Sequence, residues 1–122
     1  SLEEMTAEND RMTMIIFLSY SGKWDILQAA KKLVLKYKDN PEGLDSFQIN
    51  DFDSLLVTAG IPDPDLLIRT SGEERLSNYL LWQSAYTEFY FTDTLWPDFR
   101  KGEFRAALQE YAIRDRRYGK VK

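Results

Sequence analysis

The chain has 122 residues, of which 43% are hydrophobic and 30% charged, and its formal net charge is −4. This length and composition predict one modest globular domain and argue against a disordered chain. The absence of cysteine and histidine excludes disulfides, thiolate metal sites and catalysis by either residue. The acidic balance argues against a nucleic-acid-binding protein. No apolar run approaches the length of a membrane span, so we expect a cytoplasmic protein.

The first third of the sequence predicts a strand followed by a helix. Residues 12–20, MTMIIFLSY, form a continuous apolar run, which is typical of a strand buried on both faces of a parallel sheet. Ser21 is a suitable helix cap, and Asn40-Pro41 would end the helix. The apolar face of that helix is predicted from helical spacing and consists of Ile26, Ala30, Leu33 and Tyr37.

The remainder predicts two more strands and two or three helices. Asn50 would cap a short helix that ends at Gly60, and residues 65–70 read as a buried strand. Ser77 could cap a short helix over residues 78–86, and residues 87–93 alternate as a strand does. The last helix is predicted over about residues 100–115, with one apolar side formed by Phe104, Leu108, Tyr111 and Ala112. This order predicts an α/β fold whose mostly parallel sheet is flanked by helices.

Two arginines flank a small polar loop directly after the second predicted strand. Arg69 ends the strand, Arg75 follows six residues later, and hydroxyl groups and Gly72 lie between or beside them in LLIRTSGEERLSNYLLWQ, residues 66–83. Ligands of open α/β sheets bind beyond the carboxyl ends of the strands, and the arginine fork matches phosphate oxygens. A diphosphate site is therefore one interpretation. The other is a solvated loop in which Glu73 and Glu74 pair with the arginines, and the residues alone leave both open.

Residues 65–99 resemble the C-terminal signature of the cis-prenyltransferases, most closely that of the bacterial undecaprenyl diphosphate synthases. YSGKWDI, residues 20–26, is similar to an earlier Asn-Tyr-Gly-Gly-Arg segment of that family, with Lys23 in place of its arginine. RRYG, residues 116–119, resembles the closing Arg-x-Gly. The resemblance covers the second half of the family's sequence, so residues 1–122 are expected to be the C-terminal portion of a single domain. The segment with the family's catalytic aspartate is not among them.

The resemblance implies a magnesium-dependent prenyltransferase as the parent protein. Such enzymes condense isopentenyl diphosphate onto an allylic diphosphate, commonly farnesyl diphosphate, with cis double bonds. The product implied is undecaprenyl diphosphate, the lipid carrier precursor for cell-wall synthesis. Arg69, Arg75 and Ser77 match the residues that hold the diphosphate of isopentenyl diphosphate, and Glu88 matches a position near Mg²⁺. Supporting positions are Glu73, Arg117 and Gly119. No catalytic residue is expected in this part of the sequence, which alone should be inactive.

Several alternatives stay open. A non-catalytic accessory subunit of a cis-prenyltransferase complex is the main one, although the presence of Arg69, Arg75 and Ser77 favours the enzyme. A generic phosphate-binding module is less favoured because the matched signature is long. The arginines near the C-terminus could simply complement a helix dipole. A homodimer is expected, with peripheral membrane contact as a further expectation. The aromatic residues expected to serve core and dimer packing are Trp82, Tyr86, Phe89, Phe91 and Trp96.

Overall fold

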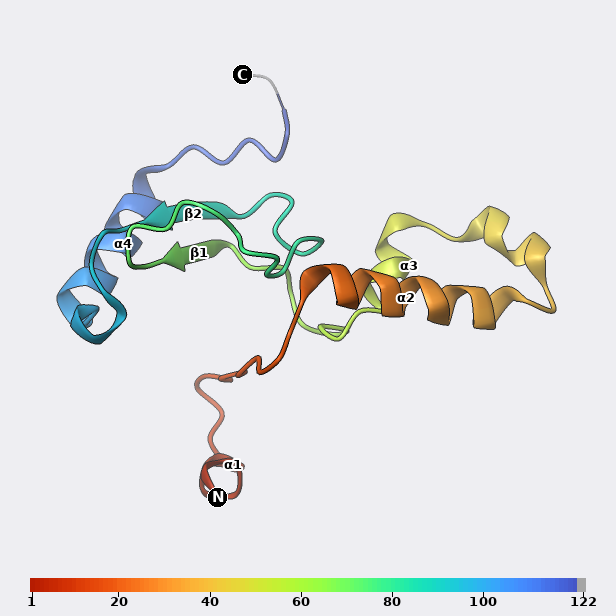
Figure 1. Cartoon of the computed structure of the whole chain (residues 1–122), viewed down its shortest axis with the longest axis horizontal. Helices are drawn as coiled ribbons and strands as arrows, with labels where there is room; N and C mark the ends of the chain where they lie inside the picture. The colour runs from red at the N-terminus through yellow and green to blue at the C-terminus, as the bar shows by residue number, and fades with distance from the viewer. Residues whose placement is uncertain (121–122) are drawn as a thin grey trace.

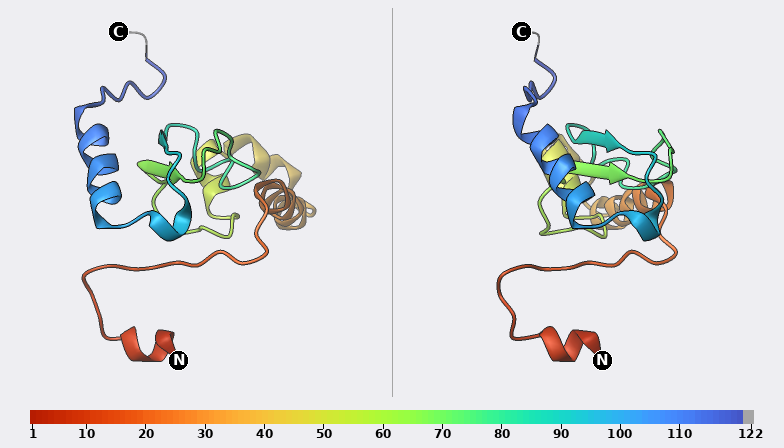
Figure 2. Two further views of the ribbon diagram at one scale, coloured as in Figure 1. Left: turned by 60° about the vertical axis from the view of Figure 1, so that its left-hand side comes forward. Right: turned by 90° about the vertical axis from the view of Figure 1, so that its left-hand side faces the viewer.

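The computed structural model describes residues 1–120, which fold as two packed groups of elements and an N-terminal arm (Figure 1). One group contains α2 (Gly22–Tyr37), η1 (Pro41–Ser46) and α3 (Ile49–Asp53). The other contains β1 (Leu66–Arg69), β2 (Glu88–Phe91), η2 (Trp96–Asp98) and α4 (Lys101–Ile113). The arm carries α1 (Leu2–Thr6) away from both groups, as the turned views in Figure 2 also show.

The sheet is a parallel pair, β1 and β2, in which Leu66 is opposite Glu88 and Arg69 is opposite Phe91. This confirms the α/β class and both strands expected in the second half of the sequence. Because the strands are parallel, their carboxyl ends meet at one edge, where Arg69 lies. α4 packs against β2. The sheet is thus small, but it defines an arginine end and an opposite end that begins with Glu88.

A buried carboxylate ties α2 to the segments around it. Ser21 caps the helix by accepting from the Trp24 amide at 3.2 Å, as its sequence predicts. Asp25, one turn later, is 1% exposed. Its oxygens accept from the Val57 amide at 3.0 Å. They also accept from the Tyr20 hydroxyl at 3.0 Å and from Gln83 Nε2 at 3.1 Å. Polar contacts thus hold α2, the turn after α3 and the loop before β2 together.

The expected strand over residues 12–20 is wrong. This segment is extended but pairs with no strand among residues 1–120, and its apolar side chains are largely exposed, as Met12 (80%) and Leu18 (82%) show. A strand needs a neighbour for its backbone N–H and C=O groups. The described part of the chain provides none here.

Two helices differ in detail from the sequence pattern. α3 is capped by Gln48, not Asn50, and ends at Asp53, after which turns lead to Gly60 with φ +81°. α4 buries Ala107, whereas Phe104 and Leu108 from the expected apolar side are 46% and 42% exposed. The two large apolar side chains therefore remain partly exposed, and an alanine is the buried residue of α4.

Candidate functional site

The arginine loop, residues 69–80, begins at the carboxyl edge of the sheet. Its first turn is fastened to the segment that follows β2: the Ser71 amide donates to the Thr94 carbonyl and the Gly72 amide to the Thr92 carbonyl, both at 2.9 Å. Ser71 and Gly72 both have positive φ, 66° and 70°. The loop therefore leaves the sheet through a tight, hydrogen-bonded turn.

Arg75 is the exposed cation of this loop. Its guanidinium lies 2.8 Å from the Glu73 carboxylate, and the two side chains are 73% and 40% exposed. An ion pair with that exposure contributes at most about 1 kcal/mol, so it holds Arg75 weakly. Arg69 is half-buried at the strand end and has no ion pair among residues 1–120. The loop thus combines one unpaired and one loosely paired guanidinium.

Ser77 does not begin a helix, which corrects the sequence expectation. Ser77 and Asn78 have φ of 49° and 62°, and turns replace the expected helix over residues 78–86. The reason is tertiary, because Asn78 is engaged by the start of α2. Its carbonyl accepts from the Gly22 amide at 2.6 Å, its Oδ1 from the Lys23 amide at 2.9 Å, and its Nδ2 donates to Ser21 Oγ at 2.6 Å.

Glu88 lies at the other end of the strand pair from Arg69, three residues before Phe91 in β2, which is about 10 Å along a strand. Its carboxylate is 3.4 Å from Arg114 Nη1, and Arg114 also donates to Glu110 at 2.6 Å and to the Phe89 carbonyl. The hydrogen bond with Glu110 is the largest cause that raises the pKa of Arg114. Glu88 raises this pKa less, and burial lowers it. Glu88 therefore fastens the tail after α4 to the sheet.

A magnesium ion does not fit the described residues alone. Mg²⁺ prefers several oxygen ligands in octahedral geometry. Residues 1–120 contain no group of three acidic side chains placed to hold a metal ion, and Glu88 already faces a guanidinium. A role for Glu88 at a metal remains a prediction.

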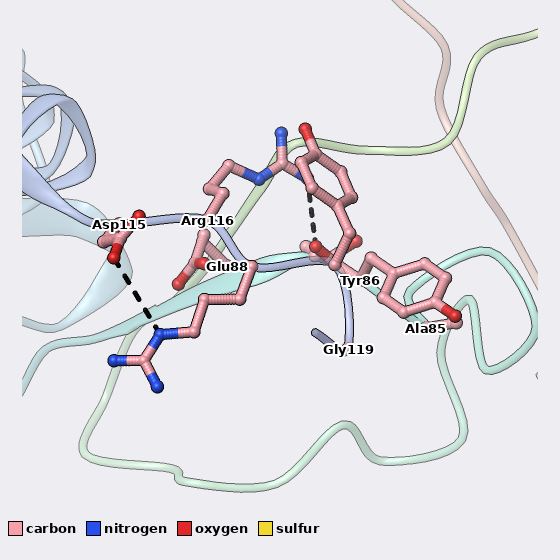
Figure 3. A pocket seen from close by; sticks show the side chains of 9 residues that line it. Ala85, Tyr86, Glu88, Asp115, Arg116 and Gly119 are labelled. Carbon is pink, nitrogen blue, oxygen red and sulfur yellow. Dashed lines mark hydrogen bonds and ion pairs between the residues drawn. The ribbon is translucent and has the colours of Figure 1, made fainter. Parts of the chain in front are cut away.

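The C-terminal tail forms a pocket of about 380 Å³ with residues 85–88 (Figure 3). Arg116 is its organising group, with Nη1 donating to Asp65 at 2.7 Å and Nη2 to the Tyr86 carbonyl at 3.0 Å. The hydrogen bond with Asp65 is the largest cause that raises the pKa of Arg116. The Tyr118 ring stacks beneath its guanidinium, 4.4 Å away.

Arg117 and Gly119, both expected to be supporting residues, line the same pocket. Arg117 is 3.9 Å from Asp115 and is 55% exposed. Gly119 has φ +79°, and a Cβ there would lie 3.2 Å from Tyr86 Cε1. The two residues are thus brought together with Glu88, and they lie at the opposite end of the strands from Arg69.

Residues 1–119 match the family model for prenyltransferases, described as undecaprenyl diphosphate synthase. This chain belongs to that family.

Curated relatives of this chain extend the match over nearly all of its residues. Isoprenyl transferase of Chlorobaculum tepidum is 54% identical and covers 97% of the chain, which spans 44% of that relative. In Legionella pneumophila strain Paris, ditrans,polycis-undecaprenyl-diphosphate synthase ((2E,6E)-farnesyl-diphosphate specific) is 48% identical; the match covers 98% of this chain and 50% of that enzyme. The chain thus spans about half the length of these curated relatives.

A solved structure supports the same fold. Lavandulyl diphosphate synthase from Lavandula x intermedia, in complex with dimethylallyl diphosphate, superposes with a TM-score of 0.88 at 40% identity. The match covers 97% of this chain and 51% of that one. The β1–β2 pair and its helices therefore have the fold of the matching half of that structure.

The sequence pattern predicts the two arginines of the loop but not the residues that hold their surroundings. Asp25, Asn78 and Arg116 were not singled out for the contacts they make. Asn78 directly follows Ser77 and its amide can both donate and accept, which is the one local signal available. Asp25 and Arg116 act through partners that are more than thirty residues away, and spacing along the chain gives no sign of such contacts.

Proposed function

We propose that this chain is the part of a cis-prenyltransferase that binds the diphosphate of isopentenyl diphosphate. The observation that carries the proposal is the arginine loop at the carboxyl edge of a parallel sheet. Arg69 has no ion pair within residues 1–120, and Arg75 has only an exposed one. A diphosphate carries more charge than the single Glu73 carboxylate and offers bidentate oxygens, so it competes effectively for Arg75. Ser77, two residues after Arg75 in the sequence, is the proposed hydroxyl donor.

The reaction of the whole protein follows from that role. The allylic carbon–oxygen bond breaks and its electron pair leaves with the allylic diphosphate. The alkene of isopentenyl diphosphate attacks the resulting carbon, and a proton is lost to give the new cis double bond. The arginines of this chain hold the attacking substrate in position, which lowers the entropic part of the barrier.

Farnesyl diphosphate is the proposed allylic partner and undecaprenyl diphosphate the proposed product, which would serve cell-wall synthesis. The Legionella relative's name specifies farnesyl diphosphate, and dimethylallyl diphosphate in the lavender enzyme is also allylic. Magnesium dependence is part of the proposal. Because Glu88 is the single candidate ligand here, its companions are assigned to the portion of the relatives that this chain does not span. That portion is also where we place the catalytic aspartate, so the 122 residues alone should not turn over.

A second copy of the chain is the proposed partner, in a cytoplasmic protein. Among residues 1–120, large apolar side chains remain exposed beside the sheet, including Leu95 (57%) and Trp96 (71%). No helix in that part of the chain is long and apolar enough to cross a membrane. Light scattering on the purified protein tests the homodimer.

Calorimetric titration with isopentenyl diphosphate tests the proposed site. Arg69→Ala and Arg75→Ala should each weaken binding at least tenfold, the scale expected for losing a charge-assisted contact. Arg105→Ala is the matched control, because Arg105 is exposed on α4 and should leave the affinity unchanged. Equal affinity for all four proteins would refute the site. Turnover by the chain alone would refute the assignment of catalysis to other residues.

A further inference from the structure

The arginine loop is fastened at both ends, and the second fastening involves residues that no substrate contact requires. Its start is held by the backbone bonds of Ser71 and Gly72. Its end is held by Asn78, the residue after Ser77, which binds the first turn of α2 through three separate atoms. Residues 73–77 lie between these two fixed points.

The contacts between Asn78 and α2 use the helix donors that are otherwise unpaired. The first amides of a helix lack intrahelical acceptors. Here Gly22 and Lys23 donate to Asn78, and Trp24 donates to Ser21 Oγ. Ser21 Oγ also accepts from Asn78 Nδ2 at 2.6 Å. The start of α2 is therefore occupied by the loop, so it holds the loop in place and does not offer these amides to an anion.

The backbone of the loop requires such a fastening. Ser77 and Asn78 both have left-handed φ values, 49° and 62°. Asparagine tolerates this region, but serine adopts it at a cost, and such a conformation persists where surrounding contacts enforce it. Without the bonds to α2, the loop would relax, and the direction of the Ser77 side chain would change with it.

We propose that Ser21 and Asn78 form a latch that fixes the arginine loop in the conformation that binds isopentenyl diphosphate. Both are positioning residues: they act through Ser77 and Arg75 and do not contact the substrate. The proposal rests on the proposed function of the arginine loop. It adds that diphosphate affinity in this chain depends on a hydroxyl at position 21, where the family segment that residues 20–26 resemble has glycine.

Ser21→Gly removes the hydroxyl at little cost to the helix, since glycine is nearly as good a helix cap as serine. We expect the dissociation constant for isopentenyl diphosphate, measured by calorimetry on the full chain, to rise about two- to tenfold, the loss typical of one hydrogen bond. The thermal unfolding midpoint should hardly change. Ser21→Thr keeps the hydroxyl and should restore wild-type affinity. The structural control is Ser46→Ala, whose hydroxyl donates to the Gly43 carbonyl within η1.

A double-mutant cycle separates the latch from a general loss of structure. Ser21→Gly combined with Asn78→Ala should bind no more weakly than Asn78→Ala alone, because both remove the same contact. Amide hydrogen exchange at Lys23, whose amide donates to Asn78 Oδ1, should become faster in Asn78→Ala without ligand. Unchanged affinity in Ser21→Gly, with Arg75→Ala still defective, would overturn the latch and leave the proposed function intact. Unchanged affinity in Arg75→Ala as well would overturn both.

Discussion

Replacing Asp25 by alanine should destabilise the chain more than any exposed substitution. The carboxylate is 1% exposed and accepts from Tyr20, Val57 and Gln83. Gln83 Nε2 keeps a second acceptor, Thr58 Oγ1, at 3.0 Å. The other two donors would be left without a partner in a partly buried site, at about 1–3 kcal/mol each. We therefore expect a loss of about 2–5 kcal/mol in the free energy of unfolding.

The free energy of unfolding of a domain is usually about 5–15 kcal/mol, so the expected loss is a large fraction of it. Urea unfolding followed by circular dichroism and tryptophan fluorescence measures it. Asp25→Asn keeps one acceptor oxygen and should lose less than Asp25→Ala. Asp45→Ala, at an exposed position, controls for the loss of charge. A change below about 1 kcal/mol in Asp25→Ala would refute the claim that these hydrogen bonds organise the fold.

Two further changes test local features of the structure. Burial, with the hydrogen bond to Asp25 next, raises the pKa of Tyr20 to about 12 from an ordinary 10.0. Because the folded state favours the protonated phenol, the contribution of Tyr20 to the free energy of unfolding is complete below pH 10 and is lost as the pH rises toward 12. Urea unfolding across that range should show this loss of stability. The loss should be smaller in Tyr20→Phe. Gly72→Ala places a Cβ 3.1 Å from Asp93 Oδ1 at φ +70°, so thermal unfolding should show a loss of about 1 kcal/mol. An equal pH dependence in Tyr20→Phe, or a Gly72→Ala variant as stable as the parent, would contradict these readings.

The elements that the sequence predicts well are those whose causes are local. Ser21 caps α2 and the apolar runs at residues 65–70 and 87–93 contain β1 and β2, because caps and periodic patterns act within a few residues. The strand expected at residues 12–20 depends on a neighbour that residues 1–120 do not supply. The helix expected after Ser77 is displaced by the bonds between Asn78 and α2. Both errors arise from contacts, or missing contacts, distant in the sequence.

In the candidate site, too, the features with local causes were predicted and those set by distant contacts were not. Arg69 lies at the carboxyl end of β1, as its position in the predicted strand requires, and Arg75 follows in the loop that leaves this end. The pairing of Glu88 with Arg114 could not be read from spacing, because it depends on how α4 packs against β2. The sequence pattern therefore identified which residues carry charge, and the packing determined which of them are already paired.

The two ends of the strand pair bear on how the proposed enzyme would be assembled. The arginine loop emerges beside Arg69, whereas Arg117 and Gly119 line a pocket beside residues 85–88. About 10 Å of β2 separates these ends, and Arg116 anchors the tail by its bonds to Asp65 and the Tyr86 carbonyl. In this conformation Arg117 does not join the arginine loop of its own chain. If the tail contributes to diphosphate binding in the proposed homodimer, the geometry favours the loop of the second copy. Mixing Arg75→Ala and Arg117→Ala chains tests this: binding recovered in the mixed dimer supports a shared site, and its absence in a demonstrated mixed dimer refutes it.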